Sequence, residues 1–312
     1  MADQNGALMT SVARMYYLDG MGQSEIATIY GVSRSTVSRL LTNARERGIV
    51  RISVDAYDPR DRDLEKQVID QFGLRSAVVV RAMGGTPSSI RKGVGYFAAE
   101  AVADIVRGRQ YVGVAGGRTL GELVHHIEPQ DNAVGPTFIQ LMGAIGSSPG
   151  RIDASEQSRT LARRFKGTFR TLNLPAFAQS HRARDLFLSH DEIRGLWSTF
   201  DSLDMAIVGL GTLQESAFVE RGVLEESALA EVRAAGAVGE ICGRFFDEQG
   251  RECDTFLRDR VISIGLDKLR ACDDVMAVLS GPARGVALKA AIRGGIVKSV
   301  VLDQAGAYSM LK

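Results

Sequence analysis

The segment Gln23–Glu46 constrains the fold most, because its small, apolar and polar residues have the spacing of two short helices joined by a tight turn. Ala27 gives a small side chain where the helices would cross, and Gly31 tolerates the positive φ that the turn needs. Ser33 is suited to cap the second helix, and Ser24 can cap the first. We therefore predict a helix-turn-helix with an apolar core formed by Ile26, Tyr30, Val32, Val37 and Leu40.

The other side chains of the predicted second helix are short, polar or basic, as in a helix that enters the major groove of DNA. From Gly31 to Arg51, five arginines and one glutamate give a net charge of +4, whereas the whole chain carries +1. The alternative is an ordinary amphipathic helix pair within a larger core, but the pattern matches at both helices and at the turn. The predicted DNA-binding residues are Ser33, Arg34, Ser35, Thr36, Ser38, Arg39, Asn43 and Arg45.

The flanks of this segment complete a small domain. Thr10–Leu18 predicts a helix before it, Gly48 can end the second helix, and Ile49–Val54 alternates as a short strand. These features predict a winged helix-turn-helix over residues 1–57.

A linker is expected next, because Asp55–Arg62 is polar and contains Pro59. Leu64, Val68 and Phe72 then recur at intervals of four, which predicts a linker helix that also packs on a partner chain. The domain boundary is expected near residue 58, with an effector-binding and oligomerisation domain over residues 58–312.

Composition supports a two-domain globular protein: 312 residues are 45% hydrophobic and 24% charged. The sequence shows no apolar run of about 18 residues and no signal peptide at its start, so we expect a cytoplasmic protein without a membrane partner.

The three cysteines lack C-x-x-C spacing, and we expect them to be buried. His125 and His126 are adjacent, so on a helix they point about 100° apart. No metal site and no cofactor is expected.

Beyond residue 58, apolar β-rich runs alternate with amphipathic segments, which predicts an α/β domain with a largely parallel sheet. The predicted strands are Ala77–Val80, Tyr111–Ala115, Thr137–Leu141, Ala206–Val208, Val261–Ile264, Val275–Leu279 and Ser299–Leu302. The predicted helices are Ile90–Val106, Thr119–His126, Glu156–Phe165 and Gly285–Arg293.

Glycines follow several of these strands, where ligands bind in open α/β sheets. Gly116 and Gly117 precede Arg118 and Thr119 at the start of a helix, a place where backbone N–H groups and a hydroxyl can hold an anion. Gly209–Thr212 likewise offers backbone N–H groups at glycines and a threonine hydroxyl. Neither segment is a P-loop or a complete G-x-G-x-x-G, and each alone is better explained as a structural turn. Together they favour an anion or polyol pocket.

No catalytic motif is evident: G-x-S-x-G and H-E-x-x-H are both absent from the sequence. Isolated carboxylates such as Glu240, Asp247 and Asp303 are as well suited to bind sugar hydroxyls as to catalyse.

The sequence resembles the SorC family of bacterial sugar-responsive transcriptional regulators almost from end to end. The N-terminal marks are MYYLDGMGQSEIA, from Met15, and SRSTVSRLLTNARERGIVRISV. The later marks, in the family's order, are GVAGGRTL, QLMGAIG, VGLGT, GEICGRFFDEQG and GPARGVALKAAIRGGIVKSVVLDQAGA.

The resemblance implies a Rossmann-like effector domain related in fold to glucosamine-phosphate deaminase, ribose-phosphate isomerase and the CoA transferases. It also implies a homotetramer and effectors that are phosphorylated sugars or polyols. The family commonly has Lys where this chain has Arg284, and often Asn where it has Met142. Arginine keeps an anion contact but cannot form a Schiff base. The predicted effector-binding residues are Gly116, Gly117, Arg118, Thr119, Gln157, Gly209, Gly211, Glu240 and Arg284.

We therefore expect a regulator, and a repressor in particular, of a carbohydrate or polyol catabolic operon. A sugar, polyol or sugar-phosphate effector would control its affinity for operator DNA, and no catalytic residue is assigned. The alternatives are a sugar-phosphate isomerase or deaminase with an ancillary DNA-binding segment, and a helical module that binds a protein partner instead of DNA.

Overall fold

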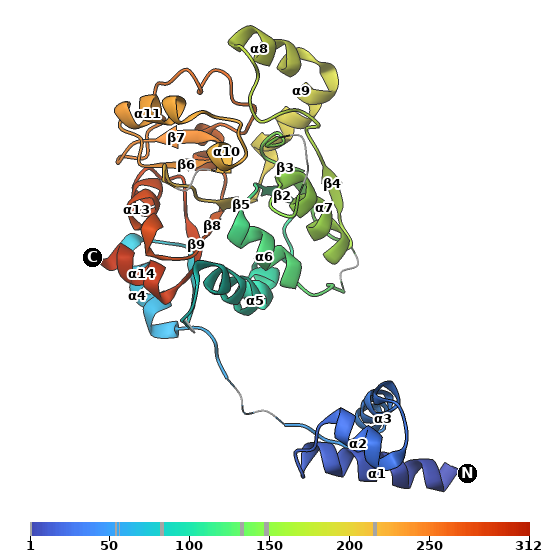
Figure 1. Cartoon of the computed structure of the whole chain (residues 1–312). Helices are drawn as coiled ribbons and strands as arrows, with labels where there is room; N and C mark the ends of the chain where they lie inside the picture. The colour runs from blue at the N-terminus through green and yellow to red at the C-terminus, as the bar shows by residue number, and fades with distance from the viewer. Residues whose placement is uncertain are drawn as a thin grey trace. The chain divides into compact units, whose positions relative to one another are not determined.

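The computed structural model describes residues 2–53, 55, 57–81, 84–131, 134–146, 150–214 and 217–312. The chain divides into two compact units, Met1–Tyr57 and Asp58–Lys312, which Figure 1 shows joined by a single segment. No described helix has the length and apolar character needed to cross a membrane.

The first unit contains three helices, α1 (Ala2–Tyr17), α2 (Gln23–Tyr30) and α3 (Arg34–Glu46). The sequence predicted the second and third closely, but α1 begins well before Thr10. Ile26 and Val37 are buried as predicted, while the other predicted core residues are partly buried. The buried core of this unit consists of Val12, Ala13, Ile26, Ala27, Val37, Leu41 and Ala44.

The turn between α2 and α3 has the predicted geometry. Gly31 ends α2 in the left-handed conformation, with φ 62° and ψ 33°. Ser33 caps the N-terminus of α3, and its hydroxyl accepts a 3.1 Å hydrogen bond from the backbone N–H of Thr36. The prediction that Ser24 caps α2 was wrong, because the helix already includes Ser24 and begins after Gly22.

The predicted wing strand is also not found over residues 49–53, and residue 54 lies outside the described residues. The N–H of Val50 donates to the carbonyl of Ala44, which continues the end of α3 rather than starting a strand. An extended segment becomes a strand only when a second strand pairs with its backbone, and alternation in sequence does not provide that partner.

The second unit is built on a seven-stranded sheet with the order β1-β9-β8-β5-β2-β3-β4, in which every neighbouring pair is parallel. Its strands are β1 (Ser76–Val80), β2 (Tyr111–Val114), β3 (Thr137–Gln140), β4 (Thr168–Arg170), β5 (Met205–Gly209), β8 (Val275–Val278) and β9 (Ser299–Asp303). A separate antiparallel hairpin consists of β6 (Gly239–Ile241) and β7 (Arg244–Phe246).

Helices cover both faces of this sheet, as Figure 1 shows. Along β1, Val78 and Val80 belong to one apolar cluster and Ala77 and Val79 to the other, because successive side chains of a strand point to opposite faces. The first cluster includes α5 (Pro87–Val106), α6 (Arg118–His126) and α7 (Ala154–Arg164). The second includes α4 (Arg62–Phe72), α12 (Leu266–Ala271), α13 (Gly285–Arg293) and α14 (Gln304–Leu311).

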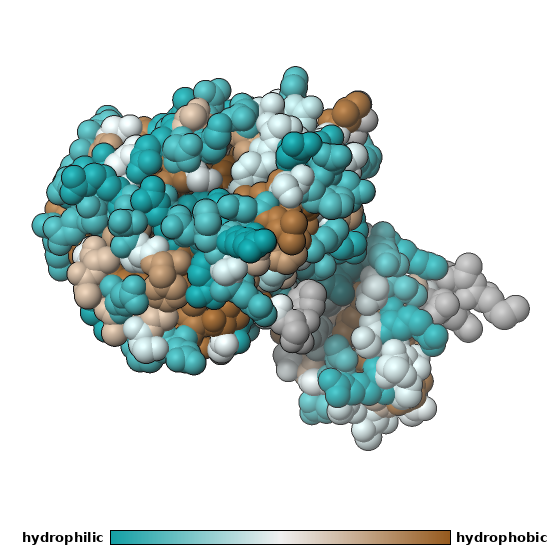
Figure 2. Space-filling model, turned by 90° about the horizontal axis from the view of Figure 1, so that it is seen from above, coloured by the Kyte–Doolittle hydropathy of each residue, from teal (hydrophilic) through white to brown (hydrophobic). Residues whose placement is uncertain are grey.

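The remaining described elements are short. They are α8 (His181–Ser189), α9 (Asp191–Trp197), the 3-10 helices η1 (Ser198–Ser202) and η2 (Pro282–Arg284), α10 (Ala217–Glu220) and α11 (Glu226–Ala234). Figure 2 shows one face of the molecule, where hydrophilic side chains predominate and hydrophobic ones form separate patches. Cys242, Cys253 and Cys272 are free and buried, as predicted.

Val261–Ile264 was predicted as a strand of the sheet, but it forms only isolated bridges with residues outside the sheet. The backbone N–H of Ile262 donates to Ala176, and that of Ile264 donates to Leu141. All four residues are buried. Burial on both sides explains the strand-like composition, while the hydrogen bonds go to two loops instead of a neighbouring strand.

The predicted linker helix is α4, and its apolar side chains pack within this chain. Leu64 and Val68 are buried and Phe72 is partly buried, all against the second core cluster. That α4 also packs on a partner chain stays a prediction, because the spacing of an apolar stripe does not show which surface covers it.

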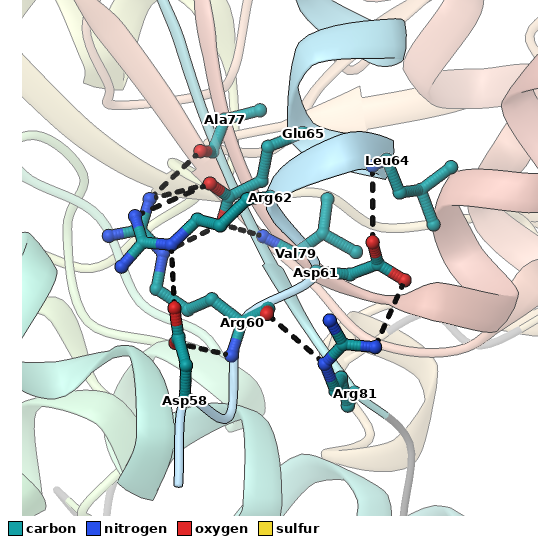
Figure 3. A network of polar contacts seen from close by, with 9 residues as sticks. All are labelled: Asp58, Arg60, Asp61, Arg62, Leu64, Glu65, Ala77, Val79 and Arg81. Atoms are coloured by element: carbon teal, nitrogen blue, oxygen red, sulfur yellow. Dashed lines mark hydrogen bonds and ion pairs between the residues drawn. The ribbon is translucent and has the colours of Figure 1, made fainter. Parts of the chain in front are cut away.

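Pro59–Asp61, in the second half of the predicted linker, forms a strap along the edge of the sheet. The N–H of Asp61 donates to Val79 in β1, and the N–H of Arg81 donates to Pro59, both at 2.8 Å. Figure 3 shows the side chains that hold this strap: Arg60 makes an ion pair of 2.6 Å with Glu65 of α4, and Glu65 accepts from the N–H of Val79. The strap therefore belongs to the second unit.

Candidate functional site

The exposed side of α3 carries most of the predicted DNA-binding residues. Val37, Leu41 and Ala44 face the core of the first unit. Thr36 and Asn43 are half-buried at the margin of that core. The other six predicted residues are exposed: Ser33, Arg34, Ser35, Ser38, Arg39 and Arg45. Arg47 and Arg51 are also exposed just beyond the helix, so the positive charge of this unit lies where it can meet phosphates.

In the second unit, strand order creates a switch point between β2 and β5. From β2 the chain continues outward to β3 and β4, and then returns to β5 on the other side of β2. The loops that leave β2 and β5 therefore diverge to opposite sides, and a crevice forms at their carboxyl ends. A pocket is found there, and it is lined by eight of the nine predicted effector-binding residues: Gly116, Gly117, Arg118, Thr119, Gly209, Gly211, Glu240 and Arg284.

Close packing explains the glycines of these two loops. A Cβ on Gly209 would lie 2.7 Å from the carbonyl oxygen of Gly116, and one on Gly211 would lie 2.2 Å from a carboxylate oxygen of Glu240. The glycines thus allow the loops to touch. The same turns are closely packed and line the pocket.

Gln157 does not line the pocket and lies behind the first loop. Its side chain is 1% exposed, and its Nε2 donates to the carbonyls of Gly117 at 2.9 Å and Arg151 at 3.0 Å. Gln157 therefore supports the turn at Gly117 through hydrogen bonds, whereas the other eight predicted residues line the pocket.

The sequence did not reveal two further arginines of the pocket, Arg91 and Arg221. Arg91 lies in the first turns of α5, and Arg221 follows α10 and donates to the carbonyl of Ile145 and the carboxylate of Asp153. With Arg118 and Arg284, four arginines and one glutamate line the same pocket. Such a surplus of guanidinium groups favours an anionic ligand.

Arg284 is held by backbone oxygens at the pocket wall. Its Nε donates to the carbonyl of Leu210 at 3.2 Å, and its Nη1 donates to that of Ser280 at 2.8 Å. The hydroxyls of Thr119 and Ser280 lie 3.3 Å apart in the same region. The loops after β2, β5 and β8 are therefore tied together around one pocket.

Glu240 faces this basic pocket from the β6–β7 hairpin. Its backbone N–H and C=O pair with those of Gly211, and its Oε2 accepts from the N–H of Gly243 at 2.9 Å. Burial raises its pKa to about 7, so the carboxyl group is partly protonated at neutral pH and can donate or accept a hydrogen bond. Burial also raises the pKa of the neighbouring Cys242 thiol.

The other two carboxylates considered from the sequence lie elsewhere. Asp247 accepts from the N–H groups of Gln249 and Arg251 in its own turn. Asp303 is buried at the end of β9, where its Oδ1 accepts from the N–H of Gly281 at 2.6 Å.

Comparison with known proteins agrees with both units. A family profile described as "Putative sugar-binding domain" matches residues 59–312, and one described as sigma-70, region 4, matches residues 10–47. This chain belongs to the SorC family of sugar-responsive transcriptional regulators. The sorbitol operon regulator of Klebsiella pneumoniae is 27% identical over 311 residues, with 98% of each chain covered. The deoxyribonucleoside regulator of Bacillus subtilis is 28% identical over 307 residues, with 97% of each covered.

The likeness extends to the three-dimensional fold. The crystal structure of the full-length sorbitol operon regulator SorC from Klebsiella pneumoniae matches this SorC-family chain with a TM-score of 0.78 and 26% identity over 98% of each chain. The prediction of a DNA-binding region followed by a parallel α/β domain is confirmed. Met142 lines the pocket and gives that wall an apolar surface.

Proposed function

We propose that α3 of this SorC-family regulator binds operator DNA in the major groove, and that the arginine-lined pocket binds the effector that controls operator affinity. The residues that carry this proposal are the exposed arginines of α3 and the four arginines at the switch point. Coupling between the two sites is reciprocal, so an effector that weakens DNA binding is itself bound more weakly in the presence of DNA. We expect repression of a carbohydrate or polyol catabolic operon.

The effector proposed is a phosphorylated sugar or polyol. Guanidinium groups match the oxygens of a phosphate, and the partly protonated Glu240 can bind a hydroxyl within the same pocket. The apolar Met142 favours a ligand with few hydroxyls on that side. The names of the relatives refer to sorbitol, which is a polyol, and to deoxyribonucleosides, which contain a sugar.

The assembly proposed is a homotetramer that presents α3 in pairs, since paired half-sites need paired recognition helices. In this assembly residues 1–57 bind DNA, and residues 58–312 bind the effector and provide the oligomer contacts. The kinship in fold with glucosamine-phosphate deaminase, ribose-phosphate isomerase and the CoA transferases is part of the same proposal, supported by the parallel sheet and the position of the pocket.

A gel shift on the DNA upstream of the protein's own gene tests the DNA-binding half. We expect a complex that prefers this sequence over unrelated DNA and weakens as salt increases, because bound arginines release counterions from phosphates. The absence of such a complex at micromolar protein would contradict the proposal.

A thermal-shift screen of sugars, polyols and their phosphates tests the pocket, because a ligand of the folded state raises the melting temperature. With the best ligand, Arg284→Ala should lower affinity about tenfold or more, since charge-assisted hydrogen bonds are lost. Arg284→Lys should retain part of the affinity. Arg163→Ala, an exposed arginine on α7, is the matched control and should leave it unchanged. Equal affinity in all four proteins would place the effector elsewhere.

The enzyme alternative has one observation in its favour: a carboxyl group with a pKa near 7 can act as a general acid or base. Incubation with the phosphosugars that bind, followed by product analysis, separates the two functions. A sensor releases its ligand unchanged, whereas an isomerase or deaminase forms product that depends on Glu240.

A further inference from the structure

A second pocket lies at the carboxyl ends of β1 and β9, and it shares no lining residue with the arginine-lined pocket. It encloses about 280 Å³, which is room for a small molecule rather than a single water. Its apolar walls come from Val80 at the end of β1 and from Ile90, Val94 and Phe97 on α5. The loops of this region are not used by the function proposed above.

Asp303 is the acidic residue that lines this pocket, and it is 1% exposed. Its Oδ1 accepts from the N–H of Gly281, which lies outside the pocket lining. Its Oδ2 is buried and has no hydrogen-bond partner among the described residues. A buried carboxylate oxygen without a partner is costly, and a donor supplied by a ligand would remove that cost.

The surroundings of Asp303 define the kind of donor. The pocket is lined also by Arg81, and it lies near the N-terminal end of α5, where the helix dipole is positive. Both features offset the negative charge of Asp303, so the pocket does not select a cationic ligand. The apolar walls disfavour a ligand with many polar groups. A neutral ligand with one hydroxyl on an apolar ring or chain suits the free carboxylate oxygen, the nearby positive charge and the apolar walls.

We propose that this second pocket binds a small neutral molecule that carries a hydroxyl on an apolar ring or chain, and that the hydroxyl donates to Oδ2 of Asp303. The occupant lies beside Arg81, which also holds the strap of the second unit. Figure 3 shows that contact: Nε of Arg81 donates to the carbonyl of Arg60 at 3.2 Å, and Nη1 lies 3.8 Å from the carboxylate of Asp61. The pocket is therefore coupled by direct contacts to the segment through which the chain reaches the DNA-binding unit.

The structure offers a variant that fills the pocket with little disturbance. Gly93 lines the pocket from within α5, and a Cβ built there meets no atom within 4 Å. Gly93→Leu therefore places a side chain into the open space. Gly195, in α9, is also a helical glycine with nothing within 4 Å of a Cβ, and Gly195→Leu is the matched control.

The experiment uses the full-length protein and three probes of similar shape: cyclohexanol, cyclohexanone and cyclohexylamine. Saturation-transfer NMR titrations give their affinities. We expect saturable binding of cyclohexanol in the millimolar range. Cyclohexanone, which cannot donate, and cyclohexylamine, which is charged, should each bind about tenfold more weakly. Gly93→Leu should abolish cyclohexanol binding, and Gly195→Leu should retain it.

Three results would overturn the proposal: no saturable cyclohexanol binding, equal binding of cyclohexanol and cyclohexanone, or full binding in the Gly93→Leu variant. Circular dichroism and melting of both glycine variants show whether each is folded. If Gly93→Leu does not fold, Asp303→Asn replaces it, and unchanged discrimination between the alcohol and the ketone in that variant contradicts the assignment. The arginine-lined pocket is not involved, so failure here leaves the proposed effector site unaffected.

Discussion

The DNA-binding unit and the effector domain place their functional residues in opposite ways. In α3, thirteen consecutive residues contain both the buried side that packs the core and the exposed side that faces outward. The pocket of the effector domain is instead assembled inward, from residues as far apart in sequence as Arg91 and Arg284. A local sequence pattern is therefore sufficient for the first site, whereas the second depends on the order of strands in the sheet.

The largest effect should come from removing the exposed charge of α3. We expect Arg34→Ala combined with Arg39→Ala to lower operator affinity about a hundredfold or more, since each arginine contact with a base contributes about 1–3 kcal/mol. Fluorescence anisotropy on the operator measures this, and effector binding should be retained because the pocket is in the other unit. Arg163→Ala serves as a charge-matched control. Unchanged operator affinity would mean that α3 is not the recognition helix.

A smaller effect is expected from the carboxyl group inside the pocket. The pKa of Glu240 is about 7 in the folded protein and 4.5 in the unfolded chain, so the unfolded chain releases this proton first as pH rises. The contribution of Glu240 to the free energy of unfolding should therefore be greatest below about pH 4.5 and fall until about pH 7, by up to about 3 kcal/mol.

Urea unfolding of the wild type and of Glu240→Gln between pH 5 and 8 measures this contribution. The variant has no carboxyl group at this position and should lose less stability over the range. Glu248→Gln, at an exposed position in the next turn, should follow the wild type. Identical pH profiles for Glu240→Gln and the wild type would show that Glu240 does not titrate in this range.

The smallest effect tests the turn of the DNA-binding unit. Gly31 has φ 62°, and a Cβ built there would meet no other atom. Gly31→Ala should therefore destabilise the unit only through the left-handed backbone conformation, by about 1–2 kcal/mol. Thermal unfolding of the N-terminal unit, followed by hydrogen exchange of α2 and α3, detects the loss. Gly195→Ala, in a helix with ordinary φ, should be neutral or slightly stabilising. Equal stability of the two variants would show that the left-handed turn is not a constraint.

The sequence predicts best those parts of the structure that depend on local patterns. The turn at Gly31, the cap at Ser33 and the strands from β1 to β9 that belong to the sheet depend on local patterns, and most were predicted within a few residues. The two wrongly predicted strands share a cause, because a strand needs a partner strand that the local pattern does not identify. The wing segment and Val261–Ile264 both had the composition of a strand, but residues 49–53 form no strand and Val261–Ile264 forms only isolated bridges outside the sheet.

The effector pocket shows the same limit. Glycine turns after strands could be recognised, because parallel strands place their carboxyl ends at one edge. Arg91 and Arg221 follow no such rule, since they enter the pocket from α5 and from the segment after α10. The sequence places Gln157 in this region, but the hydrogen bond from its amide to the Gly117 carbonyl depends on how α7 packs in the fold.

The strap at Pro59–Asp61 has a consequence for how the second unit avoids aggregation. β1 is one of the two edge strands of the sheet, and an uncovered edge offers free N–H and C=O groups to any other extended chain. Residues of the strap bond to Val79 and Arg81 along this edge, and proline at position 59 has no N–H of its own to offer. A chain shortened to begin at Arg62 would lose the strap, and the uncovered edge of β1 would be prone to aggregate. A chain that begins at Asp58 would keep the strap.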